Sequence, residues 1–546
     1  MFDTALWLKD LNDQQRKAAT WGEGPLLIVA GAGSGKTKTL ACRVACLLDR
    51  GVPPERVMLL TFTRRAAREL LTRAGKTGGG KGATRVWGGT FHSVANRLLR
   101  MHGKAVGLPP SFTVMDESDS ADLMNLVRSE LELDRSKNRF PRKETLVSIY
   151  SRVVNSQTRL EEVLNAHFPW CKDDIDGIAD VFTGYNARKR AHHVLDFDDL
   201  LVYWLALMSS PAARPVQDLF EYVLVDEYQD TNDIQARILV GLTAQRPNIT
   251  VVGDDAQAIY SFRSATVDNI LKFPEQFPGA EIVTLSRNYR SSRQILDASN
   301  AVIAKARKRY PKDMWCETDG LAPRLITCRD EAEQSELVCE DVLERREQGM
   351  RLVDQAVLFR AAHHSAALEV ELSKRNIPYV KYGGLRFVEA AHVKDVLSFL
   401  RVLENPRDEL SWFRLLQLIE GVGPKTAHKM IGALELGYEA PAGSPIERLP
   451  EVAERIAPTG VRSAITDLHA AAVDCRSLVP PAQIERVRPF FEDAFQRMYD
   501  APFARVRDLD QLAGMATRYK TRSGFIADLT LDPPNSTADL AGPPDL

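Results

Sequence analysis

The sequence lacks the features of membrane and secreted proteins. No apolar run in its 546 residues approaches the roughly 18 residues that a membrane-spanning helix needs. Residues 1–7 lack the basic start and long apolar core of a signal peptide. The seven cysteines form no Cys-x-x-Cys pair, which argues against a disulfide framework or a zinc site. We therefore expect a cytoplasmic protein with reduced thiols.

An excess of charge of either sign is also lacking. The net charge is −2, and the hydrophobic and charged contents of 44% and 26% are ordinary for a globular protein. This balance does not indicate nucleic-acid binding, nor does it exclude it, because a narrow groove needs only local basic residues. The length predicts about three or four domains, at about 150 residues each.

A glycine-rich loop, residues 30–37, lies between two patterned segments. Residues 25–29 are apolar and predict a buried strand, whereas residues 39–48 predict an amphipathic helix. Strand, glycine loop, Lys-Thr and helix form the context of a phosphate-binding P-loop, with an ordinary glycine turn as the alternative. In a P-loop, backbone N–H groups surround the phosphates, Lys36 reaches the terminal phosphates and Thr37 ligates Mg²⁺.

Two further apolar segments, residues 221–225 and 249–253, predict strands that end in polar residues. Asp226 follows the first strand and can hold Mg²⁺, while Glu227 can act as the general base for an attacking water. Gln257 follows the second strand and can sense a terminal phosphate. Strands and helices in this order predict a parallel α/β core.

These segments belong to an ordered series of sequence motifs. They are residues 11–15 (LNDQQ), 30–37 (AGAGSGKT), 61–69 (TFTRRAARE), 89–93 (GTFHS), 196–200 (DFDDL), 225–232 (VDEYQDTN), 252–263 (VGDDAQAIYSFR) and 288–291 (NYRS). The series resembles the UvrD/Rep/PcrA family of superfamily 1 DNA helicases, from about residue 8 to the C-terminus. The resemblance implies RecA-like P-loop NTPase motor domains with parallel sheets, and two mainly helical inserted subdomains. It also implies an ATP-dependent DNA helicase or translocase that moves 3′→5′ on single-stranded DNA, in repair or replication.

The same resemblance implies ATP and Mg²⁺ as cofactors, and single-stranded DNA and single-strand/duplex junctions as partners. Gln15 would read adenine, Tyr289 would stack on the base, and Arg290 would contact the γ-phosphate. The implied catalytic residues are Lys36, Asp226, Glu227, Gln257 and Arg290. The implied nucleotide-binding residues are Gln15, Gly33, Ser34, Gly35, Lys36, Thr37, Tyr289 and Arg290, with Thr37 and Asp226 holding the metal.

A DNA track is implied by the aromatic and polar residues of the remaining motifs. Aromatic rings stack on bases, and polar groups contact phosphates. The implied residues are Thr61, Phe62, Thr63, His92, Ser93, Phe197, Tyr260, Phe262 and Arg263. Phe91 is left open between this track and the core. Residues 420–427 resemble a helix–hairpin–helix turn that holds a DNA phosphate, although a simple tight turn is equally compatible with the sequence.

The resemblance also predicts the domain order. The expected parts are a first motor domain (1–100 and 192–285), a helical insertion (101–191), the N-terminal part of a second motor domain (286–395) with strands at 353–359 and 377–380, a second helical insertion (396–520) and a disordered tail (521–546). The last two helicase motifs of the family are absent, so we expect an incomplete second motor domain. The alternatives are an ATP- and DNA-binding protein without unwinding activity, or one half of a split helicase completed by a second chain.

Overall fold

The computed structural model describes residues 6–531 except 134–139, 262–263, 382–389, 438–442 and 500–501. The described residues fall into two compact units. The large unit lies within Met1–Asp319 and Ala391–Asp532, and the small unit lies within Gly320–Ala390. Residues 286–319, which we assigned to the second motor domain, therefore pack with the large unit. In the described part of the chain, no helix is both long and apolar enough to cross a bilayer.

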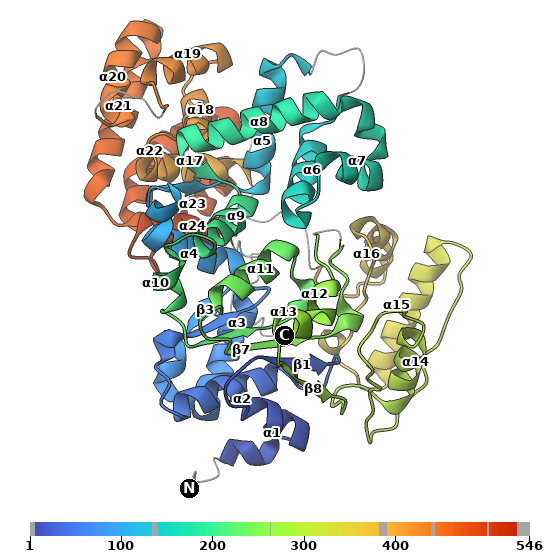
Figure 1. Ribbon diagram of the computed structural model, residues 1–546. Coiled ribbons are helices and arrows are strands. Elements are labelled where there is room, and N and C mark those ends of the chain that lie inside the picture. Colours follow the sequence, from blue (N-terminus) through green and yellow to red (C-terminus); the bar gives the residue numbers. More distant parts are fainter. Residues whose placement is uncertain are drawn as a thin grey trace. The chain divides into compact units, whose positions relative to one another are not determined.

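A six-stranded parallel sheet forms the centre of the large unit, with strand order β3-β2-β6-β7-β1-β8 (Figure 1). The strands are β1 (Leu26–Ala30), β2 (Val57–Leu60), β3 (Trp87–Gly89), β6 (Tyr222–Val225), β7 (Ile249–Gly253) and β8 (Glu281–Leu285). The predicted α/β fold with a parallel sheet is confirmed. Because parallel strands end at one edge, the motifs that follow them are brought together there.

Both faces of this sheet are buried, which explains why its strands read as continuous apolar runs. On β1, Leu27 and Val29 face a cluster shared with helices α4 (Phe91–His102), α9 (Phe197–Met208) and α11 (Asp233–Leu242). Leu26 and Ile28 face the opposite cluster, against α2 (Lys36–Asp49) and α3 (Arg64–Ala74). Because successive side chains of a strand point to opposite faces of the sheet, the apolar residues of β1 contribute alternately to two cores.

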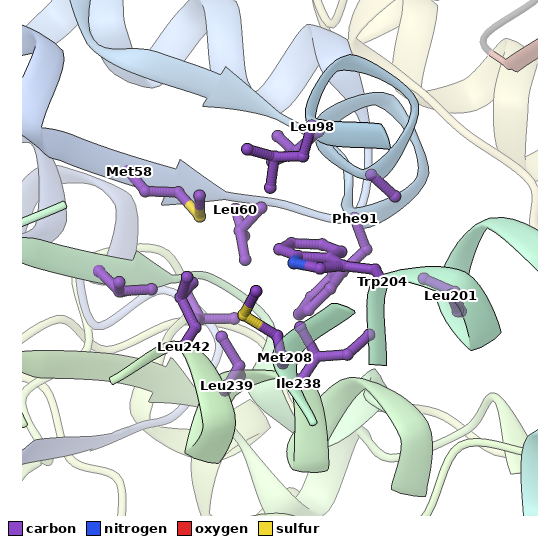
Figure 2. Packing of buried hydrophobic residues seen from close by; sticks show 14 of the residues in the cluster. Met58, Leu60, Phe91, Leu98, Leu201, Trp204, Met208, Ile238, Leu239 and Leu242 are labelled. Carbon is purple, nitrogen blue, oxygen red and sulfur yellow. The ribbon is translucent and has the colours of Figure 1, made fainter. Parts of the chain in front are cut away.

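Phe91 belongs to the first of these cores. Its ring lies beside that of Trp204, with ring centroids 6.1 Å apart, among Leu60, Met208 and Ile238 (Figure 2). The side chain of Phe91 is buried. In this structure Phe91 therefore packs as a core residue and offers no ring to a ligand.

The first insertion is helical, as its sequence predicts, and has its own apolar core. Its helices are α5 (Glu117–Glu130), α6 (Lys143–Ser156), α7 (Leu160–His167) and α8 (Ile175–His192). A two-stranded parallel sheet, β4 (Thr113–Val114) with β5 (Val194–Leu195), joins the two ends of the insertion. The insertion thus leaves and re-enters the motor core at one place.

The second insertion also consists of helices joined by turns, with no strand among its described residues. Its helices are α17 (Ala391–Glu404), α18 (Glu409–Gln417), α19 (Pro424–Leu434), α20 (Pro445–Ile456), α21 (Arg462–Asp474), α22 (Pro480–Met498) and α23 (Pro502–Ala516). The remaining helices of the large unit are α1 (Asp13–Ala19), α10 (Ala213–Gln217), α12 (Asp268–Leu271), α13 (Phe273–Gln276) and α14 (Arg293–Ile303).

A further helix, α24 (Arg522–Leu531), occupies the start of the segment that we expected to be disordered. Phe525, Ile526 and Leu529 of this helix are buried, and Asp528 pairs with Arg64 at the start of α3. The prediction of disorder is therefore wrong for 522–531. The polar residues on either side of this segment indicated disorder, but packing against the rest of the unit buries its apolar side chains. Residues 532–546 lie outside the described part of the chain.

The small unit contains α15 (Glu331–Glu347) and α16 (Ala366–Lys374), which pack around Cys339, Leu368 and Leu372. The segments 353–359 and 377–380, for which we expected strands, form none in the structure. A strand is stable only when a neighbour pairs its backbone groups, and the described residues of this unit provide no such neighbour. Most apolar side chains of these segments remain on the surface, and Leu358 is 93% exposed, whereas Ile377 is buried in the small apolar cluster.

Candidate nucleotide and DNA site

The P-loop adopts the conformation that its glycines allow. Gly33 and Gly35 have φ values of +74° and +84°, a region that other residues rarely adopt. Gly35 is the N-cap of α2, and no side chain caps this helix. The first N–H groups of α2 are therefore free of a side-chain cap and suited to bind phosphate oxygens. The Ser34 hydroxyl donates to the Gly31 carbonyl at 2.7 Å. This hydroxyl therefore stabilises the loop and does not face outward.

A cavity of about 480 Å³ opens over this loop. Its lining residues are Ala32, Gly33, Gly35, Lys36, Thr37, Lys38, Glu69, Arg73, Glu227, Gln257, Tyr289 and Arg290. Its size and its basic and glycine-rich lining fit a nucleoside triphosphate. Glu69 and Arg73 of α3, which pair at 2.5 Å, were not predicted as site residues. The available sequence signal was the spacing of the pair: Arg73 lies one helical turn after Glu69, the last residue of the motif at 61–69.

The lysine of the P-loop and the proposed general base are in direct contact. Lys36 Nζ lies 2.8 Å from Glu227 Oε2. Glu227 has a φ of +50°, which is uncommon for a residue with a side chain and typical of functional sites. Gln229, which is buried, donates to the same carboxylate oxygen at 2.9 Å. An incoming phosphate would therefore compete with Glu227 for Lys36.

Asp226 is buried beside this pair and accepts a hydrogen bond from the Glu227 N–H at 3.1 Å. Burial, and next the Glu227 carboxylate, raise the pKa of Asp226 to about 6, while Lys36 opposes the rise. Burial and Glu227 likewise raise the pKa of Asp230 to about 6. These carboxyl groups are therefore unfavourable as free anions and favourable as partners of a cation.

The chemistry of Thr37 and Asp226 fits Mg²⁺, which prefers oxygen ligands. Thr37 lies in the first turn of α2, and Asp226 directly follows β6. Within the described residues, no group of three or more acidic, histidine or cysteine side chains could form an all-protein metal site. Mg²⁺ would therefore take its other ligands from phosphate oxygens and water, as is usual for nucleotide-bound Mg²⁺.

Gln15 is held next to the P-loop by the cap of its own helix. Its Oε1 accepts from the Asn12 N–H at 3.1 Å, and its Nε2 donates to the Ser34 carbonyl at 2.9 Å. Gln15 is 2% exposed and is not among the lining residues of the cavity, so its contact with adenine stays a prediction. The Tyr289 hydroxyl accepts from Asn12 Nδ2 at 3.0 Å, while its ring is 57% exposed and can stack on a base.

Asn288 is a site residue that we did not single out in the sequence. It is buried, and its Nδ2 donates to the Ala32 carbonyl at 2.6 Å. The next residue, Tyr289, donates its N–H to the Gly33 carbonyl at 2.9 Å. Together these bonds hold the segment after β8 against the P-loop and place Arg290, which is exposed, at the wall of the cavity. The position of Asn288 just before the Tyr-Arg pair was the only sequence signal.

The expected DNA track contains two pairs of aromatic rings. Phe62 and Tyr260 have ring centroids 5.0 Å apart, and His92 and Phe197 have centroids 5.9 Å apart. Phe62 is 41% exposed, and the other three rings are partly exposed. Each pair joins residues from different motifs, so the fold brings together rings that lie far apart in the sequence.

The polar residues of the track are mostly engaged within the protein. Thr61 is buried and donates its hydroxyl to the Thr63 carbonyl at 2.6 Å. The Thr63 hydroxyl caps α3, and the Ser93 hydroxyl accepts from the Thr90 N–H at 2.9 Å in a capping box. These hydroxyl groups stabilise the loops that carry them. Thr61 could contact a DNA phosphate only if its hydrogen bond to the Thr63 carbonyl were broken. Phe262 and Arg263 lie outside the described residues.

The turn before α19 retains both interpretations that its sequence allows. Gly421 has a φ of +85°, and Gly423 is the N-cap of α19 without a side-chain cap. Lys425, in the first turn of this helix, is exposed. A helix start without a side-chain cap suits a phosphate, and the same glycines also suit a tight turn between helices.

Most of this chain matches two known helicase domains. Residues 11–278 match the UvrD/REP helicase N-terminal domain, and residues 283–437 match the UvrD-like helicase C-terminal domain. The chain belongs to the UvrD-like helicase family. Every described residue of the cavity and of the ring pairs lies within these two matched regions. The resemblance on which the site residues were predicted is therefore confirmed, while the individual roles stay predictions.

Curated relatives of this UvrD-like chain are longer than the chain itself. The ATP-dependent DNA helicase PcrA of Staphylococcus aureus (strain Mu50) is 35% identical over 428 residues, which are 78% of this chain and 58% of the relative. The ATP-dependent DNA helicase PcrA of Leuconostoc citreum is 36% identical over 458 residues, which are 82% of this chain and 60% of the relative. The chain thus spans about three-fifths of the length of these relatives.

Proposed function

We propose that this chain carries the nucleotide-driven motor of an ATP-dependent DNA helicase or translocase that moves 3′→5′ on single-stranded DNA, in DNA repair or replication. The observation that best supports this proposal is the single cavity shared by Lys36, Glu227 and Gln257 from separate strands of one sheet. The names of the PcrA relatives support the choice of ATP and DNA as its ligands.

In this proposal the P-loop N–H groups and Lys36 neutralise the charge of the triphosphate. Glu227, released from Lys36, accepts a proton from the attacking water. Arg290, which lines the same cavity, contributes a second fixed positive charge. Mg²⁺, held by Thr37 and Asp226, would supply neutralisation of the phosphate oxygens.

Coupling to DNA follows from the shared sheet edge. The loop after β2 carries Phe62, and the segment after β7 carries both Gln257 and Tyr260. A change at Gln257 on loss of the terminal phosphate would therefore be transmitted along three residues to a ring that stacks on a base. Stacking on rings is tolerant of sequence, as a translocase requires.

The test is ATP hydrolysis by the purified chain with and without single-stranded DNA. We expect hydrolysis that DNA stimulates and that Lys36→Ala abolishes, because the phosphates lose their principal cation. Lys308→Ala, which removes an exposed lysine outside the cavity, is the matched control and should keep the wild-type rate. Binding of ATP and DNA without any hydrolysis would instead favour a binding protein, and 3′- and 5′-tailed duplexes test the direction.

A further inference from the structure

A buried lysine outside the predicted site lies behind the nucleotide cavity. After α14 the chain returns to the sheet through residues 310–315, which we call the strap. Lys312 of the strap is buried, with its side chain 4% exposed. Its ammonium contacts the carboxylates of Asp254 and of Asp255, the latter at 2.5 Å, and both carboxylates are also buried. Two anions at the end of β7 therefore share one cation.

This carboxylate pair positions two of the residues that we assign to nucleotide hydrolysis. Asp254 Oδ2 accepts from Gln257 Nε2 at 2.6 Å. The N–H of Asp254 donates to Gln229 Oε1 at 3.0 Å, and Gln229 Nε2 donates to Glu227 at 2.9 Å. One chain of hydrogen bonds thus joins Lys312 to the phosphate sensor on one side and to the general base on the other.

The strap also contacts the P-loop. The side chain of Met314 lies directly against Gly31, where an added Cβ would collide with the methionine sulfur and its neighbouring carbons. The Trp315 carbonyl accepts from the Asn288 N–H at 2.8 Å, and Asn288 in turn bonds the Ala32 carbonyl. The strap therefore touches both the phosphate-binding loop and the support of Gln257, within one compact unit.

We propose that Lys312 is a positioning residue for nucleotide sensing. By holding the Asp254–Asp255 pair, Lys312 fixes the side-chain amide of Gln257 toward the cavity, and the strap keeps that amide in register with the P-loop. Without the ammonium, the Asp254 carboxylate loses the cation that fixes its position, so it no longer presents a fixed acceptor to Gln257. Where Asp255 keeps its charge, the two carboxylates also repel each other. This inference rests on the proposed function, since Gln257 is the proposed sensor of the terminal phosphate.

The test measures how well the full chain discriminates between a triphosphate and a diphosphate, using a slowly hydrolysed ATP analogue and ADP at fixed Mg²⁺. The informative variant is Lys312→Met combined with Asp255→Asn, which removes the ammonium and keeps the net charge of the buried cluster. Lys312→Met alone is compared with it, and folding is checked by circular dichroism. Lys308→Met, at an exposed lysine four residues earlier, is the matched control.

We expect the double variant to lose about tenfold in the preference for the triphosphate, the size expected for one hydrogen bond to a charged group. Its affinity for ADP should stay within about twofold of wild type, because the P-loop is intact. Gln257→Ala should cause a similar loss, and adding it to the double variant should cause no further loss, because both changes act through one contact.

A folded double variant with wild-type preference would overturn the proposal, and so would losses that add when Gln257→Ala is combined with it. An equal loss of affinity for ADP and for the triphosphate analogue would show that Lys312 only stabilises the fold, and this result would also overturn the proposal. A wild-type chain that binds neither nucleotide would overturn the proposed function itself, and this inference with it.

Discussion

The affinity of this chain for Mg²⁺–ATP is expected to fall as the pH is lowered through about 6. Asp226 can ligate Mg²⁺ only as a carboxylate, and its pKa is raised from the ordinary value of 3.8 to about 6. Burial is the main cause, the neighbouring Glu227 carboxylate is the second, and Lys36 opposes both. Protons therefore compete with Mg²⁺ for the Asp226 carboxylate at a pH at which exposed aspartates are fully ionised.

The magnitude follows from the size of this shift. A shift of about two pKa units corresponds to about 3 kcal/mol between the two protonation states. Below pH 6 the affinity for Mg²⁺–ATP should fall about tenfold per pH unit, and above pH 7 it should be nearly constant. A fluorescent ATP analogue, titrated from pH 5 to 8 at fixed free Mg²⁺, measures this profile.

Two variants separate Asp226 from other titrations, because they move the midpoint in opposite directions. Glu227→Gln removes an anion and should lower the midpoint, whereas Lys36→Met removes a cation and should raise it. The same titration in EDTA reports the protonation of the nucleotide alone and serves as the baseline. A profile that matches this baseline, or a midpoint that shifts the same way in both variants, would refute the reasoning.

Two further predictions concern stability and DNA. Because the folded pKa of Asp226 lies above its unfolded value, its contribution to stability is complete below pH 3.8 and is lost as the pH rises through about 6. Asp226→Asn should therefore be more stable than wild type at pH 7.5, by up to about 3 kcal/mol in urea unfolding, and no more stable at pH 4. Phe197→Ala and Tyr260→Ala should each weaken single-strand binding by about 1–3 kcal/mol with the salt dependence kept, and unchanged affinity at fixed salt would remove that ring from the track.

The local parts of the fold and site could be predicted from the sequence. The P-loop is contained in eight consecutive residues, and the apolar runs before it and before Asp226 have no polar face, as strands buried on both sides require. The parallel sheet then follows from the order of strands and helices. The meeting of Lys36, Glu227 and Gln257 needs only the rule that parallel strands end at one edge.

The parts that depend on distant partners could not be predicted. Gln229 and Asn288 are ordinary amides in the sequence, and their roles come from hydrogen bonds to backbone groups of other segments. The helix α24 was missed because its flanking residues are polar, and its apolar face acquires a role only against the rest of the large unit. The segment 353–359 shows the reverse case, since its apolar residues predict a strand but find no pairing partner among the described residues.

Lys312 shows most clearly why sequence pattern is insufficient. It follows a run of basic residues, 305–309, whose composition indicates a solvated surface, and Lys308 within that run is indeed 72% exposed, 3.5 Å from Asp268. A surface pair of this kind contributes at most about 1 kcal/mol, so Lys308→Met should leave the free energy of unfolding nearly unchanged. Lys312→Met leaves two buried carboxylates without their cation and should lower that free energy by about 3–5 kcal/mol at pH 7. Asp255→Asn should restore part of the loss, because it removes the repulsion between the carboxylates, and a chemical-denaturation series in which both lysine variants unfold alike would contradict the burial of Lys312.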